Sequence, residues 1–321
     1  MVSMRSWVVF SDLQLHFWQE TERPDRWKDM LNVFDAVFRM AKKHNADIVF
    51  LGDLFESKRS IRSDILSATY MRIAKLMRKS DARFHFVAGN HDQYAGICTQ
   101  SAFRLGRRFL VHDSAHATCI NAEYSIYALP YGAISDPNLD YRVLCSHVDI
   151  RGAKMSQGIL AESSGVDESI FYRRGSRSLV LNGHYHVPQT IDLGKKYVRI
   201  ECLGAPLQHN WGDARSGDLE RGIYVLDMHE DGKSSTTKIP LRKFPKFYID
   251  PDDTVCIRKG VDFVRTTPKI KVESKRKGVK DIAAIDPVSF IPAFVSSRIK
   301  DERQRKKLIS AGLALLKGEG K

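Results

Sequence analysis

Long apolar runs and low-complexity segments are both missing from this chain of 321 residues. No stretch approaches the roughly 18 uninterrupted apolar residues that a membrane-spanning helix requires. The amino-terminal residues have the pattern of a strand, without the small-residue cleavage site of an exported protein. We therefore expect a soluble, cytoplasmic protein with no membrane partner.

Cysteine is also scarce, and its pattern argues against two kinds of stabilising site. The five cysteines are scattered, and no Cys-x-x-Cys pair occurs among positions 98, 119, 145, 202 and 256. Most lie in apolar contexts, as in Val143-Leu144-Cys145. Reduced, buried thiols are therefore expected in place of disulfides or a zinc–thiolate site.

The chain has enough apolar residues for a core and carries an excess of positive charge. Hydrophobic residues make up 43% of it, which suits one large domain with a small appendage or two modest domains. The net charge is +13, and residues 245–321 hold 18 Lys and Arg against 10 Asp and Glu. Because the excess is concentrated there, nucleic acid is the obvious partner, although a basic tail can also be solvated or contact an acidic protein.

Strands and amphipathic helices alternate in the first third of the chain. Apolar runs at 4–10, 47–51 and 83–88 predict buried strands, and apolar residues at helical spacing in 26–44 and 63–79 predict two helices. A repeat of strand, helix and strand indicates a parallel sheet with helices packed on it.

A second group of strands is expected after Asp92. Residues 117–129 consist of short alternating pieces, 189–202 are typical of a hairpin, and 151–165 are rich in Gly and Ser and predict a mobile loop beside the site. The remaining predicted strands are residues 141–145, 178–181 and 222–227.

Five of the predicted strands end in a polar group. In chain order the groups are Asp12, Asp53, Asn90-His91, His147 and His184-Tyr185-His186. Ligands gather outside the carboxyl ends of strands in α/β sheets, so groups distant in sequence can meet there. Carboxylate oxygens, amide oxygens and imidazole nitrogens all bind divalent cations. A lone Asp or His is more often a turn or structural residue, and it is the ordered set that favours a metal site.

In this order the motifs resemble those of the calcineurin-like metallophosphoesterases, from about residue 4 to residue 227. The resemblance implies an α/β fold, a four-layer αββα sandwich of two mixed sheets flanked by helices, here with a small C-terminal appendage. It also implies two divalent cations. The mixed oxygen and nitrogen donors favour Mn²⁺, with Mg²⁺, Fe²⁺ or Zn²⁺ as alternatives.

The resemblance also implies a role for each polar group. The first cation would be held by Asp12 and His186, the second by Asn90, His147 and His184, and the bridge between them would be Asp53. A pair of bridged cations activates a water that attacks phosphorus. His91 would assist the leaving oxygen as a catalytic group, and Asp92 would hold the loop or orient His91.

The first motif departs from the family pattern. Where the family has Asp-x-His, this chain has Asp12-Leu13-Gln14. Gln14 could ligate through its amide oxygen or leave the position to water. In an extended backbone His16 would lie on the same side as Asp12 and Gln14 and could replace the missing ligand.

Two segments point to a particular group within this family. Residues 52–57, and residues 203–208 with 210–213, are similar to segments of SbcD-type nucleases of bacteria and phages. This similarity implies exonuclease and endonuclease cleavage of DNA in recombination, repair or replication, by a homodimer that acts with an SbcC-type coiled-coil ATPase. The predicted domains are a nuclease domain (1–243), a small β-rich cap with a basic linker (244–280) and a helical segment that could bind the ATPase (281–321).

Two other functions fit the same motifs. One is a small-molecule phosphomonoesterase or phosphodiesterase of the same superfamily, which leaves the basic tail unexplained. The other is a non-catalytic DNA-binding scaffold whose metal site has decayed at Gln14. The three are separated by whether the protein hydrolyses DNA, hydrolyses a small phosphate ester, or binds DNA without hydrolysis.

Overall fold

The computed structural model describes most of the chain, and it divides the chain into two units, Met1–Thr267 and Pro268–Lys321. Each unit is described by itself. The described residues are 4–17, 25–94, 97–98, 105–134, 136, 138–154, 171, 178–191, 198–209, 211–214, 220–249, 255–259, 261–265 and 302–316. The predicted basic linker and most of the loop predicted at 151–165 lie outside them.

The first sheet contains the strand, helix and strand units that the sequence predicts. Its strands are, in spatial order, β14 (Ser234–Pro240), β13 (Gly222–His229), β1 (Met4–Phe10), β2 (Asp47–Phe50), β3 (Phe84–Val87) and β6 (Phe109–His112). The last four run parallel to one another, whereas β13 is antiparallel to both of its neighbours. Helices α1 (Trp27–His44) and α2 (Ser63–Arg78) connect the first three strands of the chain.

The second sheet is formed by the strands expected after Asp92 except the one predicted at 222–227, which is β13 and pairs with β1 in the first sheet. Its order is β11 (Gln189–Ile191), β12 (Val198–Cys202), β10 (Ser178–Asn182), β9 (Val143–Ser146), β8 (Ile126–Leu129) and β7 (Thr118–Asn121). The pairs β11–β12 and β7–β8 are antiparallel, and the central pairs are parallel. The predicted hairpin at 189–202 is therefore confirmed.

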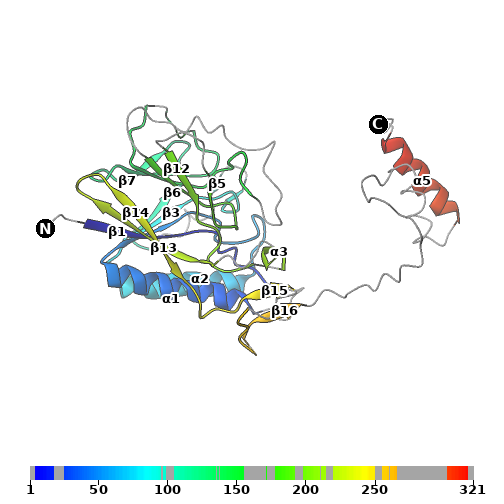
Figure 1. The fold of residues 1–321 in the computed structure, drawn as a ribbon, viewed down its shortest axis with the longest axis horizontal. Helices are drawn as coiled ribbons and strands as arrows, with labels where there is room; N and C mark the ends of the chain where they lie inside the picture. Colours follow the sequence, from blue (N-terminus) through cyan, green and yellow to red (C-terminus); the bar gives the residue numbers. More distant parts are fainter. Residues whose placement is uncertain are drawn as a thin grey trace. The chain divides into compact units, whose positions relative to one another are not determined.

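The two sheets pack face to face, and α1 and α2 cover the outer face of the first sheet (Figure 1). Strand β1 has buried side chains on both faces of the first sheet. Val8 and Phe10 pack against the helices, with the ring of Phe10 5.8 Å from that of Phe34. Trp7 and Val9 point the other way and pack against the second sheet. A strand that is buried on both faces must be apolar throughout, which explains the continuous run at its end.

The predicted fold class is confirmed, since two mixed sheets are packed together with helices outside them. In the described part of the first unit the two long helices, α1 and α2, lie on the first sheet. The outer face of the second sheet carries its own apolar cluster, which includes Tyr141, Phe171 and Tyr185. The helical layer that the resemblance implies over that face is not found among the described residues.

The segment after residue 243 contains one small sheet within the first unit. Strands β15 (Phe247–Ile249) and β16 (Phe263–Arg265) pair in parallel, and the ring of Phe247 contacts Trp211 of the short helix α3 (Trp211–Ala214) at 4.9 Å. The second unit contains helix α5 (Glu302–Leu316). Strands β4 (Gln93–Tyr94) and β5 (Ile97–Cys98) form a further short pair. None of the described helices is long and apolar enough to cross a membrane.

Candidate metal centre

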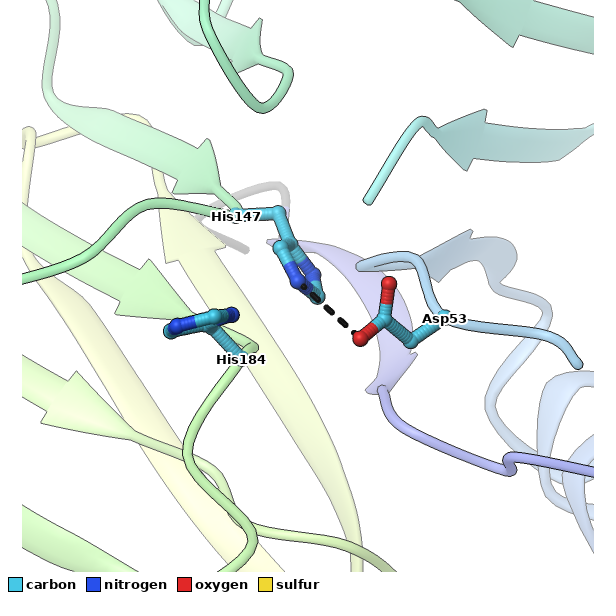
Figure 2. A group of neighbouring side chains, drawn as sticks. All are labelled: Asp53, His147 and His184. Carbon is cyan, nitrogen blue, oxygen red and sulfur yellow. Dashed lines mark ion pairs between the residues drawn. The ribbon is translucent and has the colours of Figure 1, made fainter. Parts of the chain in front are cut away.

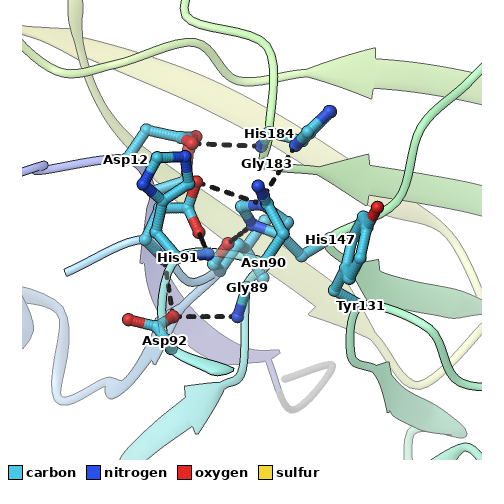
Figure 3. Close-up of polar contacts among 12 residues, drawn as sticks. Asp12, Gly89, Asn90, His91, Asp92, Tyr131, His147, Gly183 and His184 are labelled. Atoms are coloured by element: carbon cyan, nitrogen blue, oxygen red, sulfur yellow. Dashed lines mark hydrogen bonds and ion pairs between the residues drawn. The ribbon is translucent and has the colours of Figure 1, made fainter. Parts of the chain in front are cut away.

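The polar residues that follow five strands come together where the two sheets meet (Figure 2 and Figure 3). Asp12 follows β1, Asp53 follows β2, Asn90 follows β3, His147 follows β9 and His184 follows β10. The backbone leaves these strands abruptly. Asp12, Asp53 and His184 have φ angles of 51°, 60° and 74°. Each such left-handed residue costs roughly 1–2 kcal/mol, and residues of this kind persist where the surroundings fix them, as at functional sites.

One group of donors is closely packed. Ligand atoms of Asp53, His147 and His184 all lie within 4.8 Å of one another (Figure 2). The side-chain oxygen of Asn90 lies 3.0 Å from both His147 Nε2 and His184 Nδ1. These four residues are the ones that the family resemblance assigns to the second cation, with Asp53 as the bridge.

The imidazole of His184 is oriented by a carboxylate that the sequence did not reveal. Asp149 Oδ1 lies 2.6 Å from His184 Nε2, so Nε2 carries the proton and donates a hydrogen bond to the Asp149 carboxylate. The lone pair of Nδ1 then faces the oxygen of Asn90. Two acceptors that face each other are satisfied by a cation between them, and a carboxylate behind a metal-binding histidine is the usual way to fix its ring.

His147 and Asp53 form a buried ion pair. His147 Nε2 lies 3.5 Å from Asp53 Oδ2, and Nδ1 donates to the carbonyl of Leu51 at 2.5 Å. Burial alone would lower the pKa of His147, but the carboxylate of Asp53 raises it to about 10. Although burial opposes ionisation of Asp53, His147 holds the pKa of that carboxyl well below its usual range. A cation would therefore take the place of the Nε2 proton.

Asp12 has an unused oxygen that faces the same region. The residue is fully buried, and its Oδ1 accepts the backbone N–H of His184 at 3.2 Å. Its Oδ2 has no hydrogen-bond partner among the described residues. Burial, with the nearby charge of Asp53, raises the pKa of Asp12 to about 7. A buried carboxylate oxygen without a partner is costly, and coordination of a cation would remove that cost. The donors present thus fit divalent cations.

Glycine is required where the loops approach one another. A Cβ on Gly89 would lie 2.7 Å from the backbone nitrogen of Asp53 and 2.8 Å from His147 Cε1. A Cβ on Gly183 would lie 2.9 Å from His147 Nδ1. All three distances are well inside van der Waals contact, so side chains at these positions would push the ligand-bearing loops apart.

Asp92 holds two of these loops together. Its carboxylate accepts the backbone N–H groups of Asp53, Leu54 and Gly89 at 2.7, 3.0 and 2.8 Å. These hydrogen bonds fit the expectation that Asp92 holds the loop, and its role in orienting His91 stays a prediction.

His91 lies beside the cluster at the wall of an open cavity. The cavity has a volume of ≈ 210 Å³, and its lining residues are Gln14, Asp53, Glu56, His91, His184, Tyr185 and His186. The backbone N–H of His91 donates to Asp53 Oδ1 at 2.8 Å, and its Nδ1 donates to the carbonyl of Glu56. Because Nδ1 is engaged, Nε2 is the nitrogen that can exchange a proton with a molecule in the cavity.

The extended backbone assumed for residues 12–16 is wrong. Strand β1 ends at Phe10, and both Asp12 and Gln14 have positive φ, with 44° at Gln14. The alternation that would place three side chains on one side therefore breaks down. Gln14 lines the cavity, whereas His16 is not among the residues that line it and donates from Nδ1 to the carbonyl of Gln14 at 2.7 Å.

His186 also lines the cavity, but its closest described imidazole neighbour is one that the sequence did not single out. Ligand atoms of His186, His209 and Asp213 lie within 4.8 Å of one another and form a second group that could hold a metal ion. Nothing in the sequence pattern marks His209, because it follows no strand and stands alone. Asp213 lay within a segment noted only for its similarity to nucleases.

The fold and the donor set together define an α/β metallophosphoesterase. The family model described as calcineurin-like phosphoesterase matches residues 7–188, more than half of the chain, and the chain belongs to that family. The matched range contains Asp12, Asp53, Asn90, His147, His184 and His186.

Individual relatives are more distant. The chain is 27% identical over 187 residues to the DNA double-strand break repair protein Mre11 of Halobacterium salinarum, which covers 56% of this chain and 47% of that protein. The chain thus spans about half the length of that relative. Among solved structures, it is similar to a dimetal phosphatase from Danio rerio (TM-score 0.44, 10% identity, 73% of this chain and 98% of that one). It is also similar to a purple acid phosphatase from yellow lupin (Lupinus luteus) seeds (TM-score 0.42, 13% identity, 75% of this chain and 55% of that one).

Proposed function

We propose that the protein is a metal-dependent DNA nuclease that hydrolyses phosphodiester bonds with two divalent cations, Mn²⁺ foremost. The observation that carries the proposal is the 187-residue similarity to a DNA double-strand break repair protein. The basic residues 245–321 support it, because a field of excess Lys and Arg favours binding to a polyanion.

The proposed ligands are those that the sequence suggested, with the cations shared through Asp53. Asp12 and His186 would hold the first, with Gln14 at its edge. Asn90, His147 and His184 would hold the second. When bound, such a pair activates a water and neutralises the charge that develops on the phosphoryl group.

His91 is the proposed acid for the leaving oxygen. Its Nδ1–H donates to the backbone carbonyl of Glu56, and its backbone N–H donates to Asp53 Oδ1. The ring is thereby fixed relative to the proposed bridging carboxylate, with Nε2 left to pass a proton to a leaving oxygen. The Asp92 carboxylate stabilises this arrangement, because it accepts backbone N–H groups from both the loop after β2 and the loop after β3.

A direct test incubates the purified protein with end-labelled duplex and single-stranded DNA in Mn²⁺, Mg²⁺ or EDTA. Wild type is expected to degrade DNA with Mn²⁺ and not with EDTA, and His91→Ala and Asp53→Asn are expected to lose the activity. The matched control is His116→Ala, which removes an exposed imidazole outside the cavity and should leave activity unchanged. Circular dichroism shows whether each variant is folded.

Other outcomes would point elsewhere. Equal activity in wild type and the two variants would identify a contaminating nuclease. Turnover of a small aryl phosphate without cleavage of DNA would favour the phosphomonoesterase function. Binding of DNA with no hydrolysis in any metal would favour the non-catalytic scaffold.

The partners belong to the same proposal. A homodimer acting with an SbcC-type coiled-coil ATPase would place the C-terminal segment, which includes α5, at the ATPase. Deletion of residues 287–321 should then abolish co-purification with the ATPase while the Mn²⁺ affinity of the first unit is retained. Co-purification that survives the deletion would refute this role for the segment.

A further inference from the structure

His186 lies close to two buried residues, His209 and Asp213, that have no part in the proposed hydrolysis. His209 is 2% exposed and Asp213 is fully buried. The rings of His186 and His209 lie 4.6 Å apart between centroids and are inclined at 71°. Two imidazoles and a carboxylate, packed within coordination distance inside a protein, require an explanation.

A separate cation is not the best explanation for this group. The guanidinium of Arg221 is itself buried and lies 3.8 Å from Asp213 Oδ2. The same oxygen accepts the backbone N–H of His209 at 2.7 Å. Asp213 is thus already engaged by a positive group and by the chain, and a divalent ion beside it would face a buried arginine.

The group instead forms a frame around His186. Arg221 Nη1 donates to the carbonyl of His186 at 2.6 Å and to that of Ala205 at 3.2 Å. Asp213 fixes the backbone at His209. The His209 ring then lies against the His186 ring, which also lines the cavity. His186 is therefore held at its backbone and at its ring.

Such a frame matters more in this chain because of position 14. The motif Asp12-Leu13-Gln14 has an amide where the family pattern has an imidazole. His186 is therefore the imidazole on which the first cation depends. With one strong nitrogen donor in place of two, a freely rotating His186 ring would weaken binding further. Residues behind a ligand hold it in the binding orientation.

We propose that His209 is a positioning residue that holds the His186 imidazole toward the cavity, so that the first cation binds without an imidazole at position 14. The proposal rests on the cation pair of the proposed function. His209 does not touch substrate, and Asp213 and Arg221 act through it and through the His186 backbone.

The test is titration of the full-length, metal-free protein with Mn²⁺ by calorimetry, with visible absorption of the Co²⁺-substituted protein as a spectroscopic readout. Wild type should bind two equivalents. His209→Ala should weaken one of them by about 10–100-fold, leave the other unchanged and alter the Co²⁺ spectrum. His209→Gln keeps a polar side chain of similar reach and should lose less affinity.

Two further variants separate positioning from general loss of structure. His85→Ala removes an equally buried imidazole, also 2% exposed, from strand β3 and should leave both Mn²⁺ affinities intact. Gln14→His combined with His209→Ala should recover the lost affinity, since it restores the family pattern at position 14. Recovery by that substitution is not expected if His209→Ala merely unfolds the protein.

The outcomes distinguish this inference from the function on which it rests. Two equivalents in wild type with unchanged affinities and an unchanged Co²⁺ spectrum in His209→Ala would overturn the positioning role alone. A wild type that binds no cation pair would overturn the proposed function and this inference together. Equal losses in His85→Ala and His209→Ala would also overturn the positioning role.

Discussion

Replacing Gly89 by alanine tests whether the loop after β3 must lie against Asp53 and His147 for the cations to bind. The new Cβ would lie 2.7 Å from the backbone nitrogen of Asp53 and 2.8 Å from His147 Cε1, and would also overlap the Asp53 carboxylate. Carbon contacts are normally about 3.5 Å or longer. The loop must therefore retreat by roughly 0.7 Å, and it cannot do so without moving Asn90.

The expected effect has two parts. Overpacking of this kind costs about 1–3 kcal/mol of unfolding free energy, measurable by urea denaturation of the metal-free protein. A displacement approaching 1 Å at a reacting centre can lower the rate by about 10²-fold. We therefore expect weaker Mn²⁺ binding by calorimetry, and a loss of hydrolysis larger than the loss of stability alone would produce.

Gly106→Ala is the matched control. Gly106 has a φ of +109°, and among the described residues no atom beyond its two chain neighbours lies within 4 Å of the position that a Cβ would take. Alanine there is strained by backbone conformation alone, which costs roughly 1 kcal/mol, but no ligand-bearing loop is displaced. Gly106→Ala should lose stability and keep its Mn²⁺ affinity. If Gly89→Ala also kept wild-type affinity for both cations, the close packing of the loops would not be required and the reasoning would be refuted.

Three further predictions concern titration and ring orientation. Burial raises the pKa of Asp12 to about 7. Since a proton on Asp12 competes with the first cation, the Mn²⁺ affinity of that site should fall by about tenfold from pH 8 to pH 6, and a pH-independent affinity of that site by calorimetry would contradict this expectation. Burial lowers the pKa values of His85 and His112 to about 3 and about 4. The unfolded chain then binds more protons below about pH 6.5, so unfolding free energy should fall by about 1.4 kcal/mol per pH unit for each histidine down to its folded pKa, and His85→Phe should reduce that slope in urea denaturation. Asp149→Asn should weaken binding of the second cation by about 10–100-fold, because the amide no longer fixes the proton on His184 Nε2. An unchanged Mn²⁺ titration by calorimetry would exclude this orienting role of Asp149.

Much of the first sheet could be predicted from the sequence because its residues obey simple periods. Strands buried on both faces are continuously apolar, and α1 and α2 have apolar residues at helical spacing. The positions of the polar groups at strand ends could also be predicted, because each group directly follows an apolar run. Asp12, Asp53 and His147 each follow an apolar run, and the carboxyl ends of parallel strands meet at one edge.

Local backbone geometry could not be predicted in the same way. The idea that His16 shares a side with Asp12 assumed an extended chain, and the left-handed residues at Asp12 and Gln14 remove that basis. No local pattern marks those conformations. They are imposed by contacts with the loop after β2, such as the backbone hydrogen bonds from Asp12 to Gly52 and from Gln14 to Asp53.

The amino-acid sequence by itself determined the family, helices α1 and α2, most strands of the two sheets and the side chains available as cation ligands, whereas β6 and β14 were not predicted. Only the tertiary structure decided which other residues contact and orient these ligands. Asp149 meets His184, and His209 meets His186, because strands and loops distant in sequence are packed together. A single buried Asp or His has no period and no neighbouring motif, so its role is fixed by three-dimensional contacts that the sequence pattern does not contain.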